Sequence, residues 1–512
     1  MGLTPVSLDG APIKPVEADD YDGPVAALRH LLAAVTGPVA PADAPLALVA
    51  GTVAGAPGAP GTARCAAVGI SPLSGGIAET RAEGPYAAGM RAAGVTGVVL
   101  HGRAPAPVCV VISGGEARIE PADDLWGLRT GPATDRLLQR YGAEAAVAVI
   151  GPAGERLHPY ASIVTCRHHP LPRLGLGAVL GGKNVKAVVC VGTELPPVAD
   201  PATVRRIARD YADAIRTDGL STWQRGLPGF GVWTGEPGYA PVDRFTDTTR
   251  RGGVGTVPPA IAAGATIAAC PHCPTNCIKV YAGAGVHQEA LAMLGPHDGN
   301  PDPWPLLAHH EQEGTDPVQA SGTLTVRGVA VPPFDPRVQP NLGLAYAAAP
   351  IGPRYDIVEH DLDFDPAEGI PSAYPELAAL GVEVPRPRGE LDVARTAQLM
   401  RLWSGLDALG VCVFAATPTR PLRLRLVEDL VEAVDGRRPD VLALGATRFR
   451  LQHEVNVRVG AGGAYTLPDL FFDSPVQAGP YRGAVLDRPS FSAALASLRA
   501  ALFLRDTREK DL

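Results

Sequence analysis

The chain has 512 residues, of which 46% are hydrophobic and 19% charged, and its formal net charge is −8. This length allows two to four domains with large cores, and the negative charge, without any cluster of lysines and arginines, argues against a nucleic-acid-binding surface. No apolar run reaches the roughly 18 residues needed to span a bilayer, so a membrane partner is not expected either.

Residues 1–199 are predicted to form a β-rich N-terminal domain with few helices. Short apolar runs separated by glycine and proline are typical of strands, and they occur at residues 46–50, 66–70, 97–101, 108–112, 146–150 and 187–191. We expect a short hairpin over residues 6–13. Helical spacing of apolar residues is found at residues 25–35, 87–93 and 133–141. The cysteines of this domain (Cys65, Cys109, Cys166 and Cys190) are expected to be core thiols in strands.

A glycine-rich stretch at residues 173–184 contains a G-x4-G-K match from Gly177 to Lys183. A nucleotide-binding P-loop is not predicted, because Asn184 replaces the Ser or Thr that would hold magnesium and because a strand, not a helix, is expected to follow. Two interpretations remain. The stretch is either a tight-turn hairpin, or a glycine backbone close to a phosphorylated cofactor that Arg173 contacts. Arg64 is a second phosphate-binding candidate.

Residues 200–330 are predicted to form a helical domain, and residues 331–512 a mainly helical C-terminal domain. Asp200 and Pro201 provide a cap and a first-turn proline for a helix over residues 202–216. Residues 295–326 are rich in Pro, His, Asp and Gly and lack periodicity, which predicts a loop. In the last region we expect a buried segment at 341–349 and helices at 391–405, 422–434, 446–457 and 491–503.

Cys270, Cys273 and Cys277 form a compact C-x2-C-x3-C box. Such spacing suits a soft metal site, and an iron–sulfur cluster would need one more thiolate, for which Cys412 is the candidate. The alternatives are a zinc site closed by His272, or three ordinary thiols. A cluster is favoured over zinc, because His272 lies between two of the cysteines and would be strained as a ligand. Grouped cysteines also indicate a reducing compartment and thus a cytoplasmic protein.

The motifs, in their order along the chain, resemble the aldehyde ferredoxin oxidoreductase family, whose members hold tungsten on two pterins beside a [4Fe-4S] cluster. The resemblance rests on the cysteine box together with residues 71–75, 125–127, 150–155, 177–187, 241–245, 334–337, 343–346, 407–412, 456–458 and 466–468. The box followed by the D-x-x-G-(L/V)-C motif that ends at Cys412 is the most specific part.

The resemblance implies an α+β fold, in which a β-rich N-terminal domain is covered by two mainly helical domains. It also implies a redox enzyme that interconverts a small-molecule aldehyde and its carboxylic acid at a tungsten (or molybdenum) pterin. Electrons would pass through the [4Fe-4S] cluster to ferredoxin or a similar small electron carrier. A homo-oligomer is compatible with the resemblance.

Site residues also follow from the resemblance. It assigns the cluster to Cys270, Cys273, Cys277 and Cys412. The residues that match pterin-binding positions are Arg64, Arg173, Gly175, Gly177, Asp407 and Val411, together with Arg81, which stands where the family has an asparagine. We expect the three arginines to project into one cavity between the first domain and the helical ones.

Catalytic candidates are Glu289, as a general acid or base near tungsten, His287 as its replacement in that role, and Tyr355, which stands where some relatives have a histidine. Besides Arg81 and Tyr355, the chain departs from the family in residues 295–334, which are shortened and lack a second D-x-x-G-L motif, and at Ile351, which replaces an arginine. Two other functions therefore remain open. One is a family-derived electron-transfer subunit that keeps the cluster without the metal–pterin, and the other is a zinc-stapled, non-enzymatic scaffold.

Overall fold

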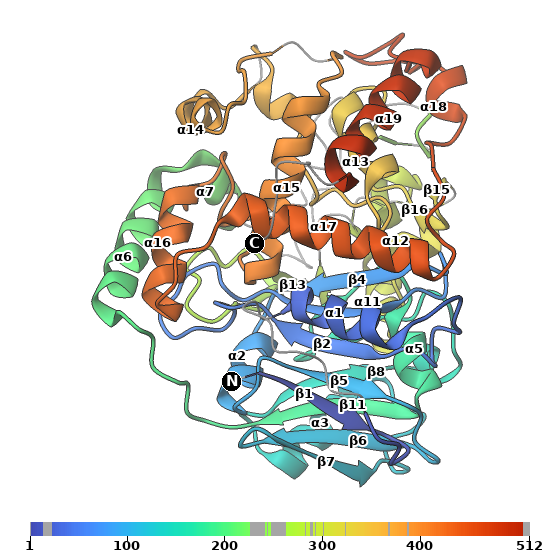
Figure 1. Ribbon diagram of the computed structural model, residues 1–512, viewed down its shortest axis with the longest axis vertical. Coiled ribbons are helices and arrows are strands. Elements are labelled where there is room, and N and C mark those ends of the chain that lie inside the picture. Colours follow the sequence, from blue (N-terminus) through green and yellow to red (C-terminus); the bar gives the residue numbers. More distant parts are fainter. Residues whose placement is uncertain are drawn as a thin grey trace.

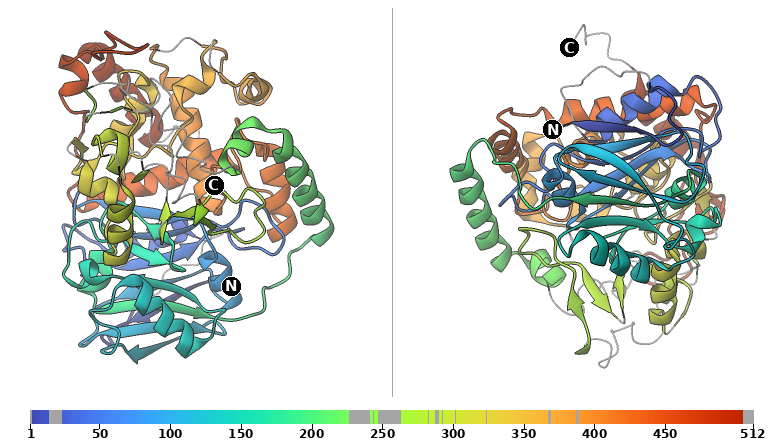
Figure 2. Two further views of the ribbon diagram at one scale, coloured as in Figure 1. Left: turned by 180° about the vertical axis from the view of Figure 1, so that it is seen from behind. Right: turned by 90° about the horizontal axis from the view of Figure 1, so that it is seen from below.

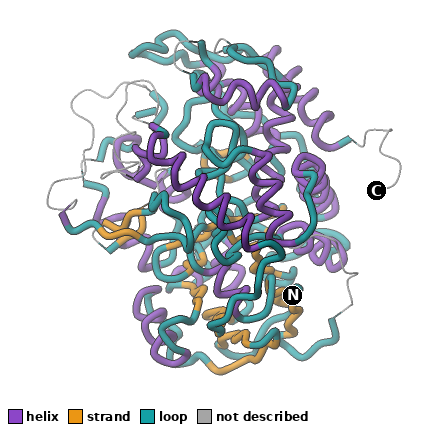
Figure 3. Tube along the Cα trace, turned by 90° about the vertical axis from the view of Figure 1, so that its left-hand side faces the viewer, coloured by secondary structure: helices purple, strands orange, loops and turns teal. Residues whose placement is uncertain are grey.

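The structure is a computed structural model that describes residues 2–13, 23–225, 241–242, 244–246, 263–281, 283–286, 290–291, 293–300, 302–322, 324–366, 369–386 and 389–504. Strands gather in one half of the molecule and the long helices in the other (Figures 1 and 3). This arrangement confirms the predicted α+β fold class.

A five-stranded sheet lies next to the helical half and is almost completely buried. Its order is β1 (Leu3–Ser7), β5 (Gly97–His101), β2 (Leu46–Ala50), β3 (Cys65–Ile70) and β4 (Ile77–Ala82). Only the β1–β5 pair is parallel. β2, β3 and β4 are buried along their whole length, because they are covered on both faces and not on one alone.

A six-stranded sheet forms the outer layer of the strand half (Figure 1). Its order is β10 (His169–Leu171), β9 (Ile163–Thr165), β8 (Ala146–Ile150), β11 (Val185–Val191), β6 (Val108–Ser113) and β7 (Glu116–Pro121). The strand β7 is at the edge, and four of its six residues are exposed, as expected for a strand with one solvated face.

Five helices accompany these sheets: α1 (Pro24–Ala34), α2 (Tyr86–Ala92), α3 (Thr130–Tyr141), α4 (Pro152–Glu155) and α5 (Leu176–Gly182). The predicted helices at 25–35, 87–93 and 133–141 are thus confirmed, and so are the six predicted strands. α1 also packs against the helical half, since it contacts α17 (Val441–Arg458).

The middle of the chain contains α6 (Pro201–Thr217), α7 (Gly219–Arg225), α11 (Trp304–Glu313), α12 (Pro317–Ser321) and a single π-helical turn (Met293–His297). Two small sheets also belong here: β12 (Thr266–Ile267), β13 (Lys279–Tyr281) and β14 (Ala284–Val286) in one, and β15 (Thr325–Val326) and β16 (Val329–Ala330) in the other. The Asp200 carboxylate accepts hydrogen bonds from the N–H groups of Ala202 and Thr203, which confirms the predicted cap. Figure 2 shows α6 on the outer flank of the molecule.

The C-terminal helices are α13 (Pro340–Ala348), α14 (Tyr374–Ala379), α15 (Val393–Leu409), α16 (Leu424–Asp435), α17, α18 (Leu470–Asp473) and α19 (Arg488–Phe503), with short 3-10 turns at Asp361–Phe364 and Pro371–Ala373. All four helices predicted here are confirmed, as is the buried segment, which is α13. The helix α15 is at the centre and packs against α13, α17 and α19. α17 contacts both α15 and β4, so this helix joins the two halves of the molecule.

Three local predictions are wrong. The hairpin at residues 6–13 is absent among the described residues, because β1 pairs in parallel with the distant β5. Residues 295–326 are not a loop but contain α11 and α12. The glycine-rich stretch forms the helix α5 instead of a tight-turn hairpin, and Gly177 and Gly181 lie so close to the backbones of Ser162 and Gly154 that a Cβ atom would clash.

No helix among the described residues has the length and hydropathy to cross a bilayer. The domain boundaries at 199/200 and 330/331 stay a prediction.

Candidate metal and cofactor site

The cysteine box lies on the loop between β12 and β13, whose antiparallel pairing brings the two ends of the loop together. The Cys273 N–H donates to the Cys270 carbonyl at 3.2 Å. His272 and Asn276 have left-handed backbone (φ 59° and 50°), which turns the chain sharply between successive cysteines. His272 is exposed, whereas all three cysteines of the box are half-buried.

Cys412 follows the end of α15, where Gly410 adopts the left-handed conformation (φ 82°) of a helix C-cap. Its N–H donates to the Gly61 carbonyl at 2.7 Å, and the Arg64 N–H donates to the Gly410 carbonyl at 3.3 Å. Gly51 lies so close to the backbone of residues 408–410 that a Cβ atom there would collide with it. The loop before β3 therefore holds the end of α15, and with it Cys412, against the first sheet.

The four cysteines are close enough to influence one another electrostatically. Burial raises the pKa of Cys270 well above the ordinary value, and the negative charges of Cys277, Cys273 and Cys412 raise it further. The pKa of Cys412 is raised by burial first, then by Glu83, and also by Cys277 and Cys273. Thiols whose charged forms repel one another in this way lose their protons only when a cation or an iron–sulfur core compensates the negative charge of the thiolates. Within the described residues, no three His, Cys, Asp or Glu side chains are grouped closely enough to hold a single metal ion.

Two of the three predicted arginines converge on one carboxylate. Arg64, directly before β3, and Arg81, on β4, both form ion pairs with Asp407 of α15. Arg64 also donates from Nε to Glu83 at 2.7 Å. The Cys412 thiol is 3.9 Å from the same glutamate, so this charge cluster borders the cysteine site.

Two further carboxylates complete the cluster. Glu79 accepts from Arg448 of α17, with Nε at 3.1 Å, and from Gln452 at 2.8 Å. Asp356 accepts from Arg354 at 2.9 Å and is 3.5 Å from Arg64. Although burial opposes ionisation, the guanidinium groups of Arg354, Arg81 and Arg64 hold the pKa of Asp356 below its ordinary value. All eight side chains are nearly or completely buried: Arg64, Arg81, Arg354, Arg448, Glu79, Glu83, Asp356 and Asp407. We call this set the arginine–carboxylate cluster.

This cluster does not fit the phosphates of a pterin cofactor in the conformation described. Among the described residues, its four guanidinium groups are matched by four carboxylates, so these arginines are already engaged in ion pairs with anions. The void beside Arg81, Asp407 and Arg448 has a volume of about 10 Å³, which is the space of a single water molecule. Ile351, noted above as replacing an arginine, lines this void.

Arg173 is placed with a different set of partners. Its N–H donates to the Asp316 carboxylate at 2.7 Å and its Nη2 to the Pro353 carbonyl at 3.1 Å. Residues 173–175 are left-handed in succession, which forms the sharp turn before α5. Gly175 and Gly177 serve close packing here, since Cβ atoms would meet the Pro159 and Ser162 carbonyls.

The remaining candidates are scattered or cannot be placed. The Tyr355 ring stacks on Phe334 at a centroid distance of 5.6 Å, in the core of the C-terminal half. Val411 is buried beside Cys412. Glu289 and His287 lie outside the described residues. Of the four cysteines predicted to lie in strands, Cys65, Cys109 and Cys190 do so, whereas Cys166 is half-buried in the turn after β9, which corrects that prediction.

Sequence reasoning missed most of the carboxylates of the arginine–carboxylate cluster. A usable signal was present in residues 77–83, where Glu79, Arg81 and Glu83 alternate with apolar or small residues. Alternation places these three side chains on one face of a strand. Charges on one face of a strand inside an apolar domain indicate a buried ion-pair network, not a solvated surface.

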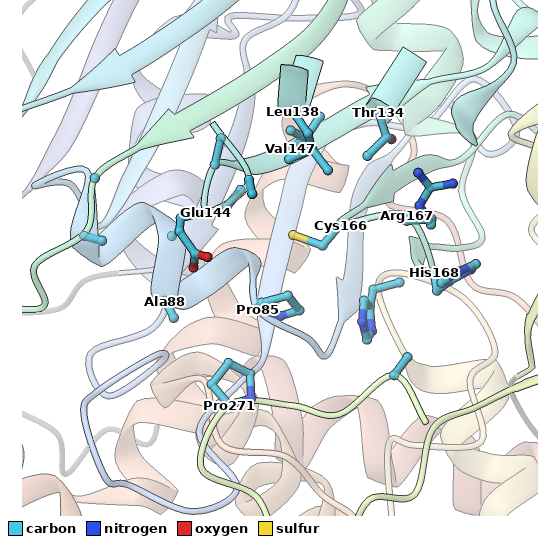
Figure 4. A pocket seen from close by; sticks show the side chains of 18 of the residues that line it. Pro85, Ala88, Thr134, Leu138, Glu144, Val147, Cys166, Arg167, His168 and Pro271 are labelled. Atoms are coloured by element: carbon cyan, nitrogen blue, oxygen red, sulfur yellow. The ribbon is translucent and has the colours of Figure 1, made fainter. Parts of the chain in front are cut away.

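A cleft of about 660 Å³ opens beside the cysteine box (Figure 4). Pro271 lies on one side of it, and Leu138 and Thr134 of α3 lie on the opposite side. Its wall near β9 carries His168, whose Nδ1 is 2.8 Å from Glu311. The cleft has the size of a ligand pocket, and it brings solvent to the backbone that carries Cys270.

Comparison with known proteins identifies two family models. One, described as "Aldehyde ferredoxin oxidoreductase, N-terminal domain", matches residues 9–192. The other, "Aldehyde ferredoxin oxidoreductase, domains 2 & 3", matches residues 313–500 and includes Cys412. The cysteine box lies between the two matched ranges.

Individual relatives carry related names. The tungsten-containing aldehyde ferredoxin oxidoreductase of Pyrococcus furiosus is 30% identical over 303 residues, which cover 54% of this chain and 48% of the relative. The aliphatic sulfonate oxidoreductase, WOR-like subunit, of the same organism is 28% identical over 177 residues, covering 32% of this chain and 28% of that protein. The chain spans about half the length, or less, of the curated relatives it matches.

Among solved structures, the active site complex BamBC of benzoyl coenzyme A reductase in complex with 1,5-dienoyl-CoA matches with a TM-score of 0.71. The match has 17% sequence identity and covers 98% of this chain and 93% of that chain. At this identity the likeness concerns the fold alone.

Proposed function

The chain belongs to the aldehyde ferredoxin oxidoreductase family, and we propose that it is a redox enzyme whose electron-transfer centre is a [4Fe-4S] cluster on Cys270, Cys273, Cys277 and Cys412. The observations that carry the proposal are the sharply turned loop that holds the three half-buried thiols of the box and the fixed position of Cys412 at the end of α15. In agreement with them, burial raises the pKa of Cys270 and the charges of the other three thiols raise it further. Four thiolates around one point are the ligand set of such a cluster.

The surroundings of Cys412 suit a bound thiolate. The Gly61 carbonyl fixes its backbone, so the side chain keeps one direction relative to the box. Arg64 lowers the pKa of this thiol, whereas burial and Glu83 raise it. An arginine beside a cluster ligand also favours the extra negative charge that the cluster gains on reduction, and Glu83 opposes it. Arg64 and Glu83 would therefore shift the reduction potential of the cluster in opposite directions.

The reaction that we propose is the interconversion of an aldehyde and a carboxylic acid, in which aldehyde and water give the acid, two protons and two electrons. It is supported by the names of the relatives, which describe tungsten-containing aldehyde ferredoxin oxidoreductases. Glu289, with His287 as the alternative, is the proposed proton acceptor. The cleft beside the box is the proposed approach for ferredoxin or a similar carrier, because Pro271 and Ala269 of the cluster loop line it.

A second candidate is an electron-transfer subunit that holds the cluster without a metal–pterin. The balanced charges of the arginine–carboxylate cluster favour it, because Arg64 and Arg81 already have carboxylate partners where pterin phosphates would need them. The match to a WOR-like subunit of an aliphatic sulfonate oxidoreductase supports the same idea.

Metal analysis of anaerobically purified protein tests both candidates. About four irons and four sulfides per chain, with an electron paramagnetic resonance signal after reduction, are expected for either one. Tungsten or molybdenum together with aldehyde-dependent dye reduction would establish the enzyme, whereas iron and sulfide alone would establish the subunit. Zinc in place of iron would contradict the proposal as a whole.

A further inference from the structure

Lys279 is a buried lysine whose ammonium group lies against the cysteine box. It is the first residue of β13 and follows Cys277 by two positions, and only 3% of its surface is exposed. Its Nζ donates to the carbonyl of Asn276, the residue directly before Cys277, and to the carbonyl of Gln224 in α7 at 3.5 Å. The side chain is therefore folded back onto the loop of the box, where solvent does not screen its charge.

No carboxylate compensates this charge within the part of the chain that the structure describes. The two acceptors of Lys279 are backbone carbonyls, and it forms no ion pair there. Lys186, which is also buried, forms an ion pair with Glu155 at 2.5 Å. Because an ammonium group buried without a counter-ion is costly, an anion beside Lys279 would stabilise the folded protein.

The negative charge closest to Lys279 along the chain is that of the box. Burial lowers the pKa of Lys279, and Cys277 raises it. Burial, Cys273 and Glu83 raise the pKa of Cys277 to about 12, against the lowering effect of Lys279. Four thiolates carry more negative charge than the iron–sulfur core between them carries positive charge. A loaded site is therefore an anion, and a one-electron reduction makes it more negative.

We propose that Lys279 is the counter-charge of the [4Fe-4S] cluster, which stabilises the reduced cluster and thereby raises its reduction potential. The inference rests on the proposed function, because that function assigns the cluster to the box. Whereas Arg64 and Glu83 border Cys412, Lys279 adds a cation on the side of the box. It makes the cluster a better acceptor of the electrons that substrate oxidation releases.

The test is a reductive titration of the anaerobically purified full chain, followed by electron paramagnetic resonance. Lys279→Met keeps the length of the side chain and removes its charge. Its equilibrium constant for cluster reduction is expected to be about tenfold lower than that of the wild type, a shift of 59 mV for one electron. This is the order of magnitude expected for one buried unit charge at roughly 10 Å. Lys279→Arg keeps the charge and is expected to retain the wild-type potential.

Lys183→Met is the matched control. Lys183 is also buried, and its Nζ donates to two backbone carbonyls at 2.9 and 3.2 Å. Its nearby charges are those of Asp43 and Asp9 and not those of cysteines. The variant loses a buried ammonium group in the same way, but its cluster is expected to keep the wild-type potential.

If K279M does not fold, K279Q replaces it, because glutamine is neutral and still donates a hydrogen bond. A lower potential in the neutral variant, with K279R and K183M unchanged, supports the proposal. Iron that is lost from both neutral variants and kept in K279R supports it too, since the charge is then needed to hold the anionic cluster. An unchanged potential in the neutral variant, or an equal fall in K279R or K183M, overturns the proposal and leaves the proposed function intact. Wild-type protein without iron and sulfide would contradict both.

Discussion

The ion pair between Glu79 of β4 and Arg448 of α17 joins the two halves of the molecule, and its removal has a calculable consequence. Glu79 is completely buried and accepts from Arg448 and Gln452. In the variant E79Q the volume is preserved and only the charge is lost. Leaving one charge of a buried pair uncompensated costs about 3–5 kcal/mol of unfolding free energy.

We expect the lower end of that range, about 3 kcal/mol, because Arg448 keeps other partners. Its Nη1 remains 3.1 Å from the Ser404 carbonyl, 3.0 Å from the Ser404 hydroxyl and 3.5 Å from Asp407. The assay is guanidinium denaturation followed by circular dichroism. Glu428→Gln is the control, since Glu428 is a partly exposed partner of Arg438, which keeps two other carboxylates, and its loss is expected to cost less than about 1 kcal/mol.

The same pair predicts a pH dependence. Burial opposes ionisation, but Arg448 and Arg81 hold the pKa of Glu79 below the ordinary glutamate value of 4.5. A carboxylate whose pKa is lower in the folded state contributes stability above the unfolded-state pKa, and this contribution is lost as the pH falls through the folded-state pKa. The difference in unfolding free energy between wild type and E79Q should therefore be largest at pH 7 and should become smaller below pH 4.5. A loss under 1 kcal/mol at pH 7, or a difference that grows in acid, would refute the reasoning.

Three further predictions concern the proposed centre. Cys412→Ser should lose most of the bound iron and sulfide, whereas Cys190→Ala, a strand thiol near Tyr86, should keep them; equal iron in both proteins would exclude Cys412 as a ligand. Ala88→Trp fills the cleft beside the box and should slow the reduction of the cluster by ferredoxin about tenfold at unchanged iron content. Ala443→Trp, in a separate cavity on α17, should leave this rate unchanged. Equal rates in the two variants would show that electrons do not enter through the cleft. Glu289→Gln should abolish aldehyde oxidation and preserve iron; unchanged turnover would show that this carboxylate has no catalytic role.

Local signals in the sequence were sufficient for elements whose stability is itself local. The helix α6 begins at Asp200 because this side chain caps it, and it buries Val204, Ile207, Tyr211 and Ile215 at helical spacing. The cysteine box could be found for the same reason, since three of the proposed ligands lie within eight residues.

Features that depend on distant partners could not be found in this way. The strand β1 pairs with β5, more than 90 residues away, and no pattern within residues 3–13 indicates this partner. The helix α11 begins with two prolines, Pro303 and Pro305, in a stretch whose composition is typical of loops. The arginine–carboxylate cluster needs β4, α15 and α17 together, so motif matching could not indicate the carboxylates that these arginines contact.

The contact between Gly51 and the end of α15 has a consequence for how the protein matures. Cys412 acquires its position only after the loop before β3, made early in synthesis, has closed on a helix end made much later. The box and Cys412 therefore become neighbours only when nearly the whole chain has left the ribosome. Assembly of the proposed cluster would be a late step that reports on completed folding, and a side chain at position 51 would lower the yield of loaded protein without altering any ligand.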